Sequence, residues 1–203
     1  FVVTIASREL DFYQLHPQVQ RIALNVEGNS RHALAGLWNN LRRVRALRTA
    51  LLRVRPQVAL AMMTTANILL AIAAWGIQGL VRIGSERTHP PRMWLGQPWE
   101  TLRRYLYGSL DAVVAVSSES AAWLRTHTRA KRVRVIPNAV LWPLPVQEPL
   151  LPVDRYLSRH RRLLLSVGRL DNEKGFDLLL RAFWILSAKY PNWDLVILGE
   201  GPS

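Results

Sequence analysis

The sequence predicts an α/β protein with parallel strands, arranged as two Rossmann-like halves. Strand-like apolar runs alternate with helix-like segments along the 203 residues. Five prolines crowd into residues 137–152 and interrupt this alternation, because closely spaced prolines fit neither a helix nor a central strand. The composition, 49% hydrophobic and 20% charged, suffices for a buried core. Cysteine is absent, which excludes a disulfide scaffold, thiolate zinc ligands and a cysteine nucleophile.

The first half contains six strand-like segments and four helical segments between them. We expect strands at 1–5, 21–26, 58–63, 80–84, 111–117 and 133–136. We expect helices at 33–53, 68–75, 99–107 and 118–126. Residues 64–67, three of which are polar, are expected to cap the second helix, and Gly76 and Gly79 are expected to end it. Ser117 or Ser118 is the expected cap of the fourth.

The second half shows a strand at 162–167, a helix at 175–190 and a strand at 193–198. The pattern predicts a first domain at 1–140, a proline-rich linker at 141–160 and the start of a second domain at 161–203. The chain opens on an apolar run at Phe1 and closes on a glycine-rich turn. We therefore expect an internal fragment of a longer protein, with both domains incomplete.

Residues 58–81 carry no charged side chain, a length that has to be tested as a membrane span. A short strand after Pro56, polar residues at 64–67 and the two glycines favour strand–helix–strand instead. A small integral-membrane protein remains an alternative at this stage.

The charge is strongly positive: 27 basic residues against 14 acidic ones give a net charge of +13, and only three of the basic residues are lysines. Such a surface attracts nucleic acid, anionic lipid or phosphate-bearing substrates. A basic nucleic-acid-binding domain is therefore an alternative function. The sequence offers it no zinc-finger spacing, aromatic RNA-binding signature or helix-turn-helix.

The helix expected from residue 33 to 55 is amphipathic and basic, without an acidic residue between Arg31 and Arg55. Its apolar positions recur at helical spacing: Leu34, Leu37, Trp38, Leu41, Val44, Leu47, Leu51 and Val54. We expect the apolar stripe to pack on the sheet. The arginines then remain available for an anionic membrane surface: Arg42, Arg43, Arg45, Arg48, Arg53 and Arg55.

Residues 166–177 carry the clearest chemical signal. A strand ends at Gly168, a polar loop follows, and a helix begins near Gly175. Ligands of doubly wound folds lie at the carboxyl ends of strands, and a helix N-terminus favours phosphate. Arg169 and Lys174 are placed to converge on a diphosphate; solvated loop charges are the alternative.

Several motifs in order resemble the retaining GT-B glycosyltransferases of family 4 (glycosyl transferases group 1). The resemblance covers most of the chain and is strongest in 133–202. Its motifs are DAVVAVS at 111–117, VIPNAV at 135–140, VGRL at 167–170, EKG at 173–175, LLLRAF at 178–183 and LVILGEGP at 195–202.

This resemblance implies a GT-B fold, with two Rossmann-like domains facing a cleft. It implies a glycosyltransferase that moves a sugar from a UDP- or GDP-sugar with retention of configuration. Gly168, Arg169 and Lys174 then bind the donor diphosphate, because fixed cations stabilise the departing nucleoside diphosphate. No metal or other cofactor is implied, and the sequence has no D-x-D pair. The family's two-glutamate motif would lie beyond Ser203.

In the first, acceptor-side domain, residues 83–90 resemble the Ser-Glu-(His/Arg) segment of family 4 enzymes that build lipid-linked oligosaccharides. The resemblance implies that Glu86 and His89 are catalytic and that Arg87 contacts the acceptor or sugar. A surface pairing of Glu86 with Arg87 or Arg82 is the alternative. A lipid-linked saccharide acceptor places the enzyme in the cytoplasm, peripheral on the inner face of the cell membrane, in polysaccharide assembly and without nucleic acid as a partner.

Overall fold

The computed structural model describes residues 1–10, 14–28, 33–140, 142–143 and 161–201. The chain forms two compact units, Phe1–Val140 and Leu141–Ser203, and each is described by itself. The linker predicted at 141–160 lies outside the described residues, apart from 142–143.

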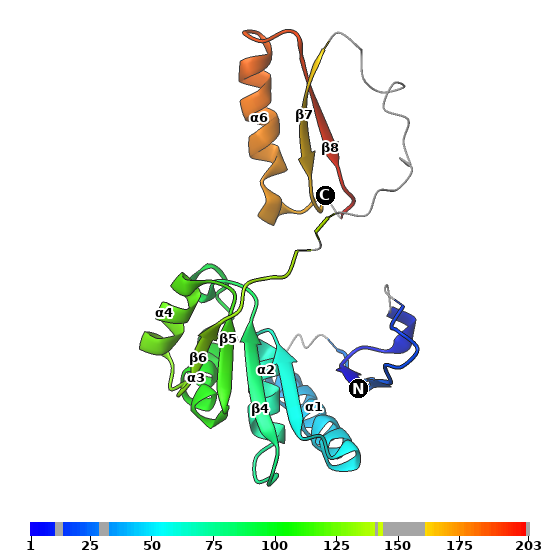
Figure 1. Cartoon of the computed structure of the whole chain (residues 1–203), viewed down its shortest axis with the longest axis vertical. Helices are drawn as coiled ribbons and strands as arrows, with labels where there is room; N and C mark the ends of the chain where they lie inside the picture. The colour runs from blue at the N-terminus through cyan, green and yellow to red at the C-terminus, as the bar shows by residue number, and fades with distance from the viewer. Residues whose placement is uncertain (11–13, 29–32, 141, 144–160, 202–203) are drawn as a thin grey trace. The chain divides into compact units, whose positions relative to one another are not determined.

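Parallel strands form the centre of the first unit (Figure 1). Four of them make one sheet in the order β3-β4-β5-β6, and β1 pairs with β2 in a separate sheet. Each strand overlaps a segment where the sequence predicts one, so these predictions are confirmed. The strands are β1 Val2–Thr4, β2 Arg21–Ala23, β3 Val58–Met62, β4 Val81–Glu86, β5 Ala112–Ala115 and β6 Val133–Val135.

Four α-helices connect or flank these strands, as the sequence predicts. Ser117 caps the last of them, since its hydroxyl accepts a hydrogen bond from the Ser120 backbone N–H at 3.1 Å. Three short 3₁₀ segments complete the unit. The helices are α1 Ala33–Val54, α2 Thr64–Ala73, α3 Gln97–Leu106 and α4 Ser118–His127; the 3₁₀ segments are η1 Arg8–Leu10, η2 Pro90–Arg92 and η3 Tyr107–Ser109.

The predicted start of α2 is wrong. The helix begins at Thr64, four residues before the expected Ile68, and Met63 occupies the cap position without a side-chain hydrogen bond. Thr64 and Asn67 do not cap the helix because their side chains bond to β4, as described below. The predicted stop is confirmed, since Gly76 and Gly79 both adopt φ of 74°, which glycine tolerates without strain.

The charge-free stretch 58–81 folds as β3, α2 and the first residue of β4, which confirms the strand–helix–strand interpretation. The apolar side chains of α2 are buried together with Leu110, Val113 and Leu124. Within the ranges that the structure describes, no helix combines the length and apolarity needed to cross a bilayer.

The second unit contains β7 (Arg162–Val167), a 3₁₀ segment η4 (Asn172–Lys174), α6 (Phe176–Ser187) and β8 (Trp193–Leu198). The two strands are parallel and pair in register from Arg162 with Trp193 to Val167 with Leu198. Figure 1 shows α6 running alongside this pair. Both strands have the predicted bounds.

Candidate functional site

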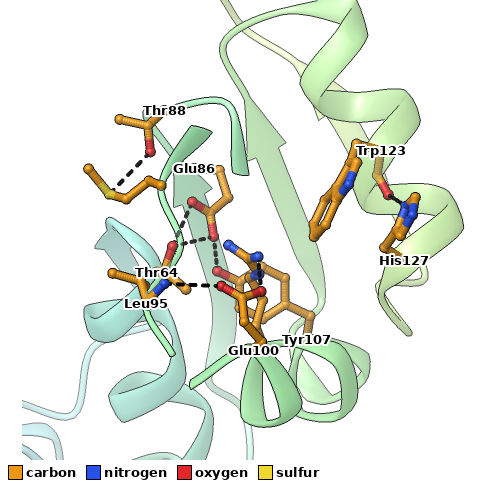
Figure 2. A network of polar contacts seen from close by, with 10 residues as sticks. Thr64, Glu86, Thr88, Leu95, Glu100, Tyr107, Trp123 and His127 are labelled. Atoms are coloured by element: carbon orange, nitrogen blue, oxygen red, sulfur yellow. Dashed lines mark hydrogen bonds and ion pairs between the residues drawn. The ribbon is translucent and has the colours of Figure 1, made fainter. Parts of the chain in front are cut away.

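The first of the three site residues predicted in the first unit is buried in its core. Glu86, the last residue of β4, is only 1% exposed. Both of its carboxylate oxygens accept hydrogen bonds from the Thr64 hydroxyl, at 3.0 and 2.9 Å, and the Tyr107 hydroxyl donates a further one (Figure 2). The carboxylate is therefore held by α2 on one side and by the 3₁₀ segment η3 on the other.

Burial raises the pKa of Glu86 above its ordinary value. Hydrogen bonds from Tyr107 and Thr64 and the positive charge of Arg103 act in the opposite direction, but desolvation is the largest effect. Burial also raises the pKa of Tyr107, and the neighbouring Glu86 carboxylate adds to this. Tyr107 therefore stays a neutral hydrogen-bond donor.

Arg103 supplies a buried positive charge beside this carboxylate. It is 2% exposed and forms an ion pair with Glu100, its neighbour on α3. Its guanidinium lies 4.7 Å from the ring centroid of Trp123, and that indole stacks on His127 with centroids 4.5 Å apart. Figure 2 shows Glu100 and Tyr107 close below Glu86, with Trp123 and His127 on α4 to the side.

Asn67 extends the network to the backbone of β4. Its Oδ1 accepts from the Ser85 N–H at 3.1 Å, and its Nδ2 donates to the Ser85 carbonyl at 3.3 Å and to the Tyr107 hydroxyl at 3.0 Å. Space for this amide depends on Gly84. A Cβ there would lie 2.8 Å from Leu110 Cδ1 and 3.1 Å from Asn67 Cγ.

Sequence reasoning missed Thr64, Asn67, Arg103 and Tyr107 as partners of this network. One signal was available: Thr64 and Asn67 are polar, three residues apart and therefore on one face of an apolar helix. Inward-facing polar side chains need partners, since burying them unpaired costs free energy. Among the described residues, every buried side-chain nitrogen and oxygen has a hydrogen-bond partner.

Arg87 and His89, which follow Glu86, contact residues outside this network. Arg87 donates to the Oδ1 of Asn138. His89 places Nδ1 3.1 Å from the Ser120 hydroxyl and Nε2 3.5 Å from the Glu119 carboxylate, both at the start of α4. The three predicted residues therefore share one segment but have separate partners.

The surface pairing of Glu86 with an arginine, weighed above as the alternative, is wrong. Arg82 instead pairs with Asp111 at 3.2 Å, joining the starts of β4 and β5 and lowering the pKa of Asp111. A direct contact of Glu86 with a sugar stays a prediction, and the structure sets a condition on it. The side chain is only 1% exposed, so a sugar could reach it only if the residues packed around it moved.

A recess of about 460 Å³ lies in the same unit, and it was missed from the sequence. Ile5 follows β1, Glu27 follows β2 and Thr65 follows β3, so residues beyond the carboxyl ends of three strands meet there. Arg43 holds one wall, because its guanidinium donates to the carbonyls of Val26 and Gly28 at 3.1 and 2.9 Å. The lining residues are Ile5, Glu27, Gly28, Asn40, Arg43, Thr65, Leu69 and Trp99.

The second unit holds the loop with Gly168, Arg169 and Lys174. Arg169 and Lys174 are exposed, and neither side chain forms an ion pair within the part of the chain that the structure describes. Lys174 ends the 3₁₀ segment, whose first turn is capped by Asp171. Gly175 precedes α6 and offers no side-chain cap, which leaves the first N–H groups of the helix open to an anion.

The backbone of this loop is fixed by the segment after β8. The N–H groups of Gly168 and Leu170 donate to the carbonyls of Leu198 and Glu200, both at 3.0 Å. Gly199 lies so close that a Cβ there would overlap the carbonyl oxygen of Gly168, and Gly201 stands in the same relation to Leu170. The glycines of the 195–202 motif thus permit two adjacent loops to run in contact.

Across the described residues, no three His, Asp or Glu side chains come close enough to hold an ion.

The comparison with protein families gives two matches. The sequence model described as Glycosyltransferase Family 4 matches residues 2–140, and the one described as Glycosyl transferases group 1 matches residues 155–203. The first match covers more than half of the chain and contains the Glu86 segment. The second contains the loop with Arg169 and Lys174.

Curated relatives are glycosyltransferases. An uncharacterized glycosyltransferase of Bacillus subtilis is 34% identical over 60% of this chain and 30% of its own length. A phosphatidylinositol N-acetylglucosaminyltransferase subunit of Saccharomyces cerevisiae is 29% identical over 46% of this chain and 22% of its own. A phosphatidyl-myo-inositol mannosyltransferase of Propionibacterium freudenreichii is 32% identical over 45% of this chain and 24% of its own length. The chain thus spans less than a third of these relatives.

Two solved structures share the fold. A putative UDP-N-acetylglucosamine 2-epimerase of Listeria monocytogenes matches 87% of this chain and 48% of its own, with a TM-score of 0.52 and 13% identity. MnaA of S. aureus, in a co-structure with UDP, matches 83% and 46%, with a TM-score of 0.50 and 18% identity. At such low identity the likeness shows the fold alone, a GT-B-type α/β architecture.

Proposed function

This chain belongs to Glycosyltransferase Family 4, and on that premise we propose that it is part of an enzyme that transfers a sugar from a nucleoside diphosphate sugar to a lipid-linked saccharide. The observation that carries the donor side is the loop with Arg169 and Lys174. It presents two exposed cations and an uncapped helix start, within the stretch matched by the group 1 family.

The chemistry of the donor suits this loop. When the glycosidic bond breaks, negative charge accumulates on the departing nucleoside diphosphate. Two cations and the N–H groups of α6 stabilise that charge more in the transition state than in the bound donor, which lowers the barrier. We propose that Gly168, Arg169 and Lys174 bind the diphosphate of a UDP- or GDP-sugar, with retention of configuration and without a metal ion.

For the acceptor side, the proposal assigns Arg87 and His89 to contacts with the acceptor or the transferred sugar. Glu86 is assigned to the same site, and its buried hydrogen bonds are suited to hold the segment 87–89 in place. The recess between Glu27 and Thr65 offers the acceptor a second place to bind in this unit. The names of two relatives, which act on phosphatidylinositol lipids, support an acceptor carried by a lipid.

Such an acceptor lies in a bilayer and the donor in the cytosol. The proposal therefore places the enzyme at the cytoplasmic face of the cell membrane, in the assembly of surface polysaccharide or glycan.

Saturation-transfer NMR on the enzyme that contains this chain tests the donor assignment. UDP-sugars or GDP-sugars are expected to give saturation signals from the nucleoside diphosphate, and Arg169→Ala with Lys174→Ala to abolish them. Filter binding with duplex DNA at physiological salt is the counter-experiment. Retention of DNA without any nucleotide-sugar signal would replace this function with nucleic-acid binding. For the enzyme that contains this chain, NMR of the product has to show the anomeric configuration of the donor.

A further inference from the structure

We propose that the outward side of α1 binds the surface of a bilayer rich in anionic lipid. Its apolar side chains enter the interface and its arginines bind the lipid phosphates. We call this surface the α1 face. This inference rests on the proposed function, because membrane binding would bring the first unit to an acceptor carried by a lipid. The α1 face consists of Leu37, Trp38, Leu41, Arg42, Arg45, Leu52 and Arg53, with Arg55 directly after the helix.

The sequence predicts that the apolar stripe of this helix packs on the sheet, and for part of the stripe this is wrong. Leu51 is buried in the core, and Val44 and Leu47 pack against it. Leu37 is 70% exposed, Trp38 59%, Leu52 50% and Leu41 39%. At about 100° per residue, Leu37, Trp38, Leu41, Arg45 and Leu52 fall within an arc of roughly 100°, which adjoins the arc of the buried positions and extends away from it around the helix.

Charge on this face is of one sign. No acidic residue occurs from Gly28 to Ser85. Two arginines of α1 are engaged inside the unit: Arg43 with the carbonyls of Val26 and Gly28, and Arg48 with those of Ala73 and Trp75. The other three arginines of α1 and Arg55, directly after the helix, are exposed, and none of the four pairs with a carboxylate in the ranges that the structure describes: Arg42, Arg45, Arg53 and Arg55.

The contact of Arg48 with Trp75 brings the end of α2 beside α1. The Trp75 side chain is 79% exposed, so a second tryptophan stands near the α1 face. Tryptophan is favoured at membrane interfaces because its indole is apolar with one polar N–H. Exposed leucines and tryptophans among arginines are typical of a helix that lies in the plane of the interface.

The combination of exposed apolar and basic side chains favours a membrane over nucleic acid as the partner of the α1 face. A nucleic-acid backbone would satisfy the arginines but leave Leu37, Leu41 and Leu52 in water. Apolar exposure alone would not select this helix, because α6 also exposes Trp184 at 78% and Ile185 at 68%. The charges of α6, however, are one aspartate and one arginine, which cancel.

Co-sedimentation of the 203-residue chain with vesicles tests the proposal. Binding is expected with phosphatidylcholine vesicles that contain phosphatidylglycerol, and not with phosphatidylcholine alone. Arg42→Gln with Arg45→Gln should lower the partition coefficient roughly 25-fold, because each arginine near an anionic surface contributes about fivefold. The matched control, Arg132→Gln with Arg134→Gln, removes the same charge from exposed positions around β6 and should change it little.

Trp38→Ala tests the apolar part. Because insertion is less sensitive to salt than charge pairing, wild type should keep a salt-resistant fraction on the vesicles that Trp38→Ala loses. Trp94→Ala, which removes a similarly exposed indole from the loop before α3, is the control. Circular dichroism of each variant separates lost binding from lost folding.

Three results would overturn the proposal: no binding of wild type to either vesicle, equal losses in the α1 and control variants, or light scattering that shows a dimer which Trp38→Ala dissociates. The last would mean that the face is covered by a second copy of the chain. Saturation-transfer NMR on the same variants keeps the two proposals apart. Vesicle binding without a nucleotide-sugar signal would overturn the proposed donor binding. A nucleotide-sugar signal without vesicle binding would overturn only the proposal that the α1 face binds a membrane.

Discussion

The Tyr107 hydroxyl donates a hydrogen bond to the Glu86 carboxylate inside the first unit. Glu86, one of the two residues that the family resemblance implies to be catalytic, is thereby held from the core side, by residues of α2 and η3. The segment with Arg87 and His89 continues directly from this anchored point. Stability measurements on Glu86 therefore address the site without knowledge of the substrate.

The first prediction concerns pH. Burial raises the pKa of folded Glu86 above the ordinary 4.5. The folded state then binds the proton more tightly than the unfolded chain, so the stability linked to Glu86 is complete below pH 4.5 and is lost as pH rises through the folded pKa. Chemical denaturation of wild type and Glu86→Gln over this range should show the wild-type advantage shrinking with pH. A difference independent of pH would contradict the raised pKa of this carboxyl group.

The second prediction concerns the Tyr107 hydroxyl. Tyr107→Phe leaves the Asn67 amide and the Glu86 carboxylate each without one partner in the core. It should lower the free energy of unfolding by about 1–3 kcal/mol, the usual cost of an unsatisfied buried polar group. Tyr105→Phe, two residues earlier in α3 and 47% exposed, is the control and should change little. Equal effects of the two substitutions in urea denaturation would refute the network.

The third prediction concerns space beside β4. Gly84→Ala places a methyl group 2.8 Å from Leu110 Cδ1 and 3.1 Å from Asn67 Cγ, where the amide is fixed by hydrogen bonds. Overpacking of this kind costs about 1–3 kcal/mol in stability. Gly28→Ala, whose Cβ meets only an ordinary contact at 3.5 Å, should be nearly neutral. Thermal unfolding followed by circular dichroism compares them, and an unchanged midpoint for Gly84→Ala would show that the core can adjust.

The fourth prediction concerns the loop with Arg169 and Lys174, the proposed diphosphate site. In the enzyme that contains this chain, Arg169→Ala and Lys174→Ala should each lower turnover about 10²–10³-fold, the cost of one lost electrostatic contact to developing charge. Both side chains are exposed, so the fold should persist. Lys189→Ala, beyond the far end of α6, removes the same charge and should leave turnover unchanged. Wild-type turnover in both loop variants would exclude this loop as the diphosphate site.

The alternation of strands and helices could be predicted from the sequence because its signals are local. The bounds of β7 and β8 were predicted to the residue, since both are short apolar runs set off by polar or turn residues. The network around Glu86 could not be predicted in the same way. Thr64 and Tyr107 lie 22 and 21 residues from Glu86, so only tertiary folding brings them together.

The predictions for the start of α2 and for the packing of α1 were wrong for a related reason. Thr64 and Asn67 have the chemistry of helix caps, but a tertiary partner competes for the same side chains. Leu37 and Trp38 continue the apolar stripe of α1, yet periodicity alone does not tell how much of a stripe the core covers.

The close contact of Gly199 with Gly168 has a mechanical consequence. Backbone hydrogen bonds at Gly168 and Leu170 tie the loop after β7 to the segment after β8, and no Cβ separates them. Because Arg169 lies between these two hydrogen bonds, its backbone cannot move toward a ligand unless Glu200 moves with it. The backbone that carries the two exposed cations is therefore fixed, and Arg169 can adapt to a ligand only by turning its side chain.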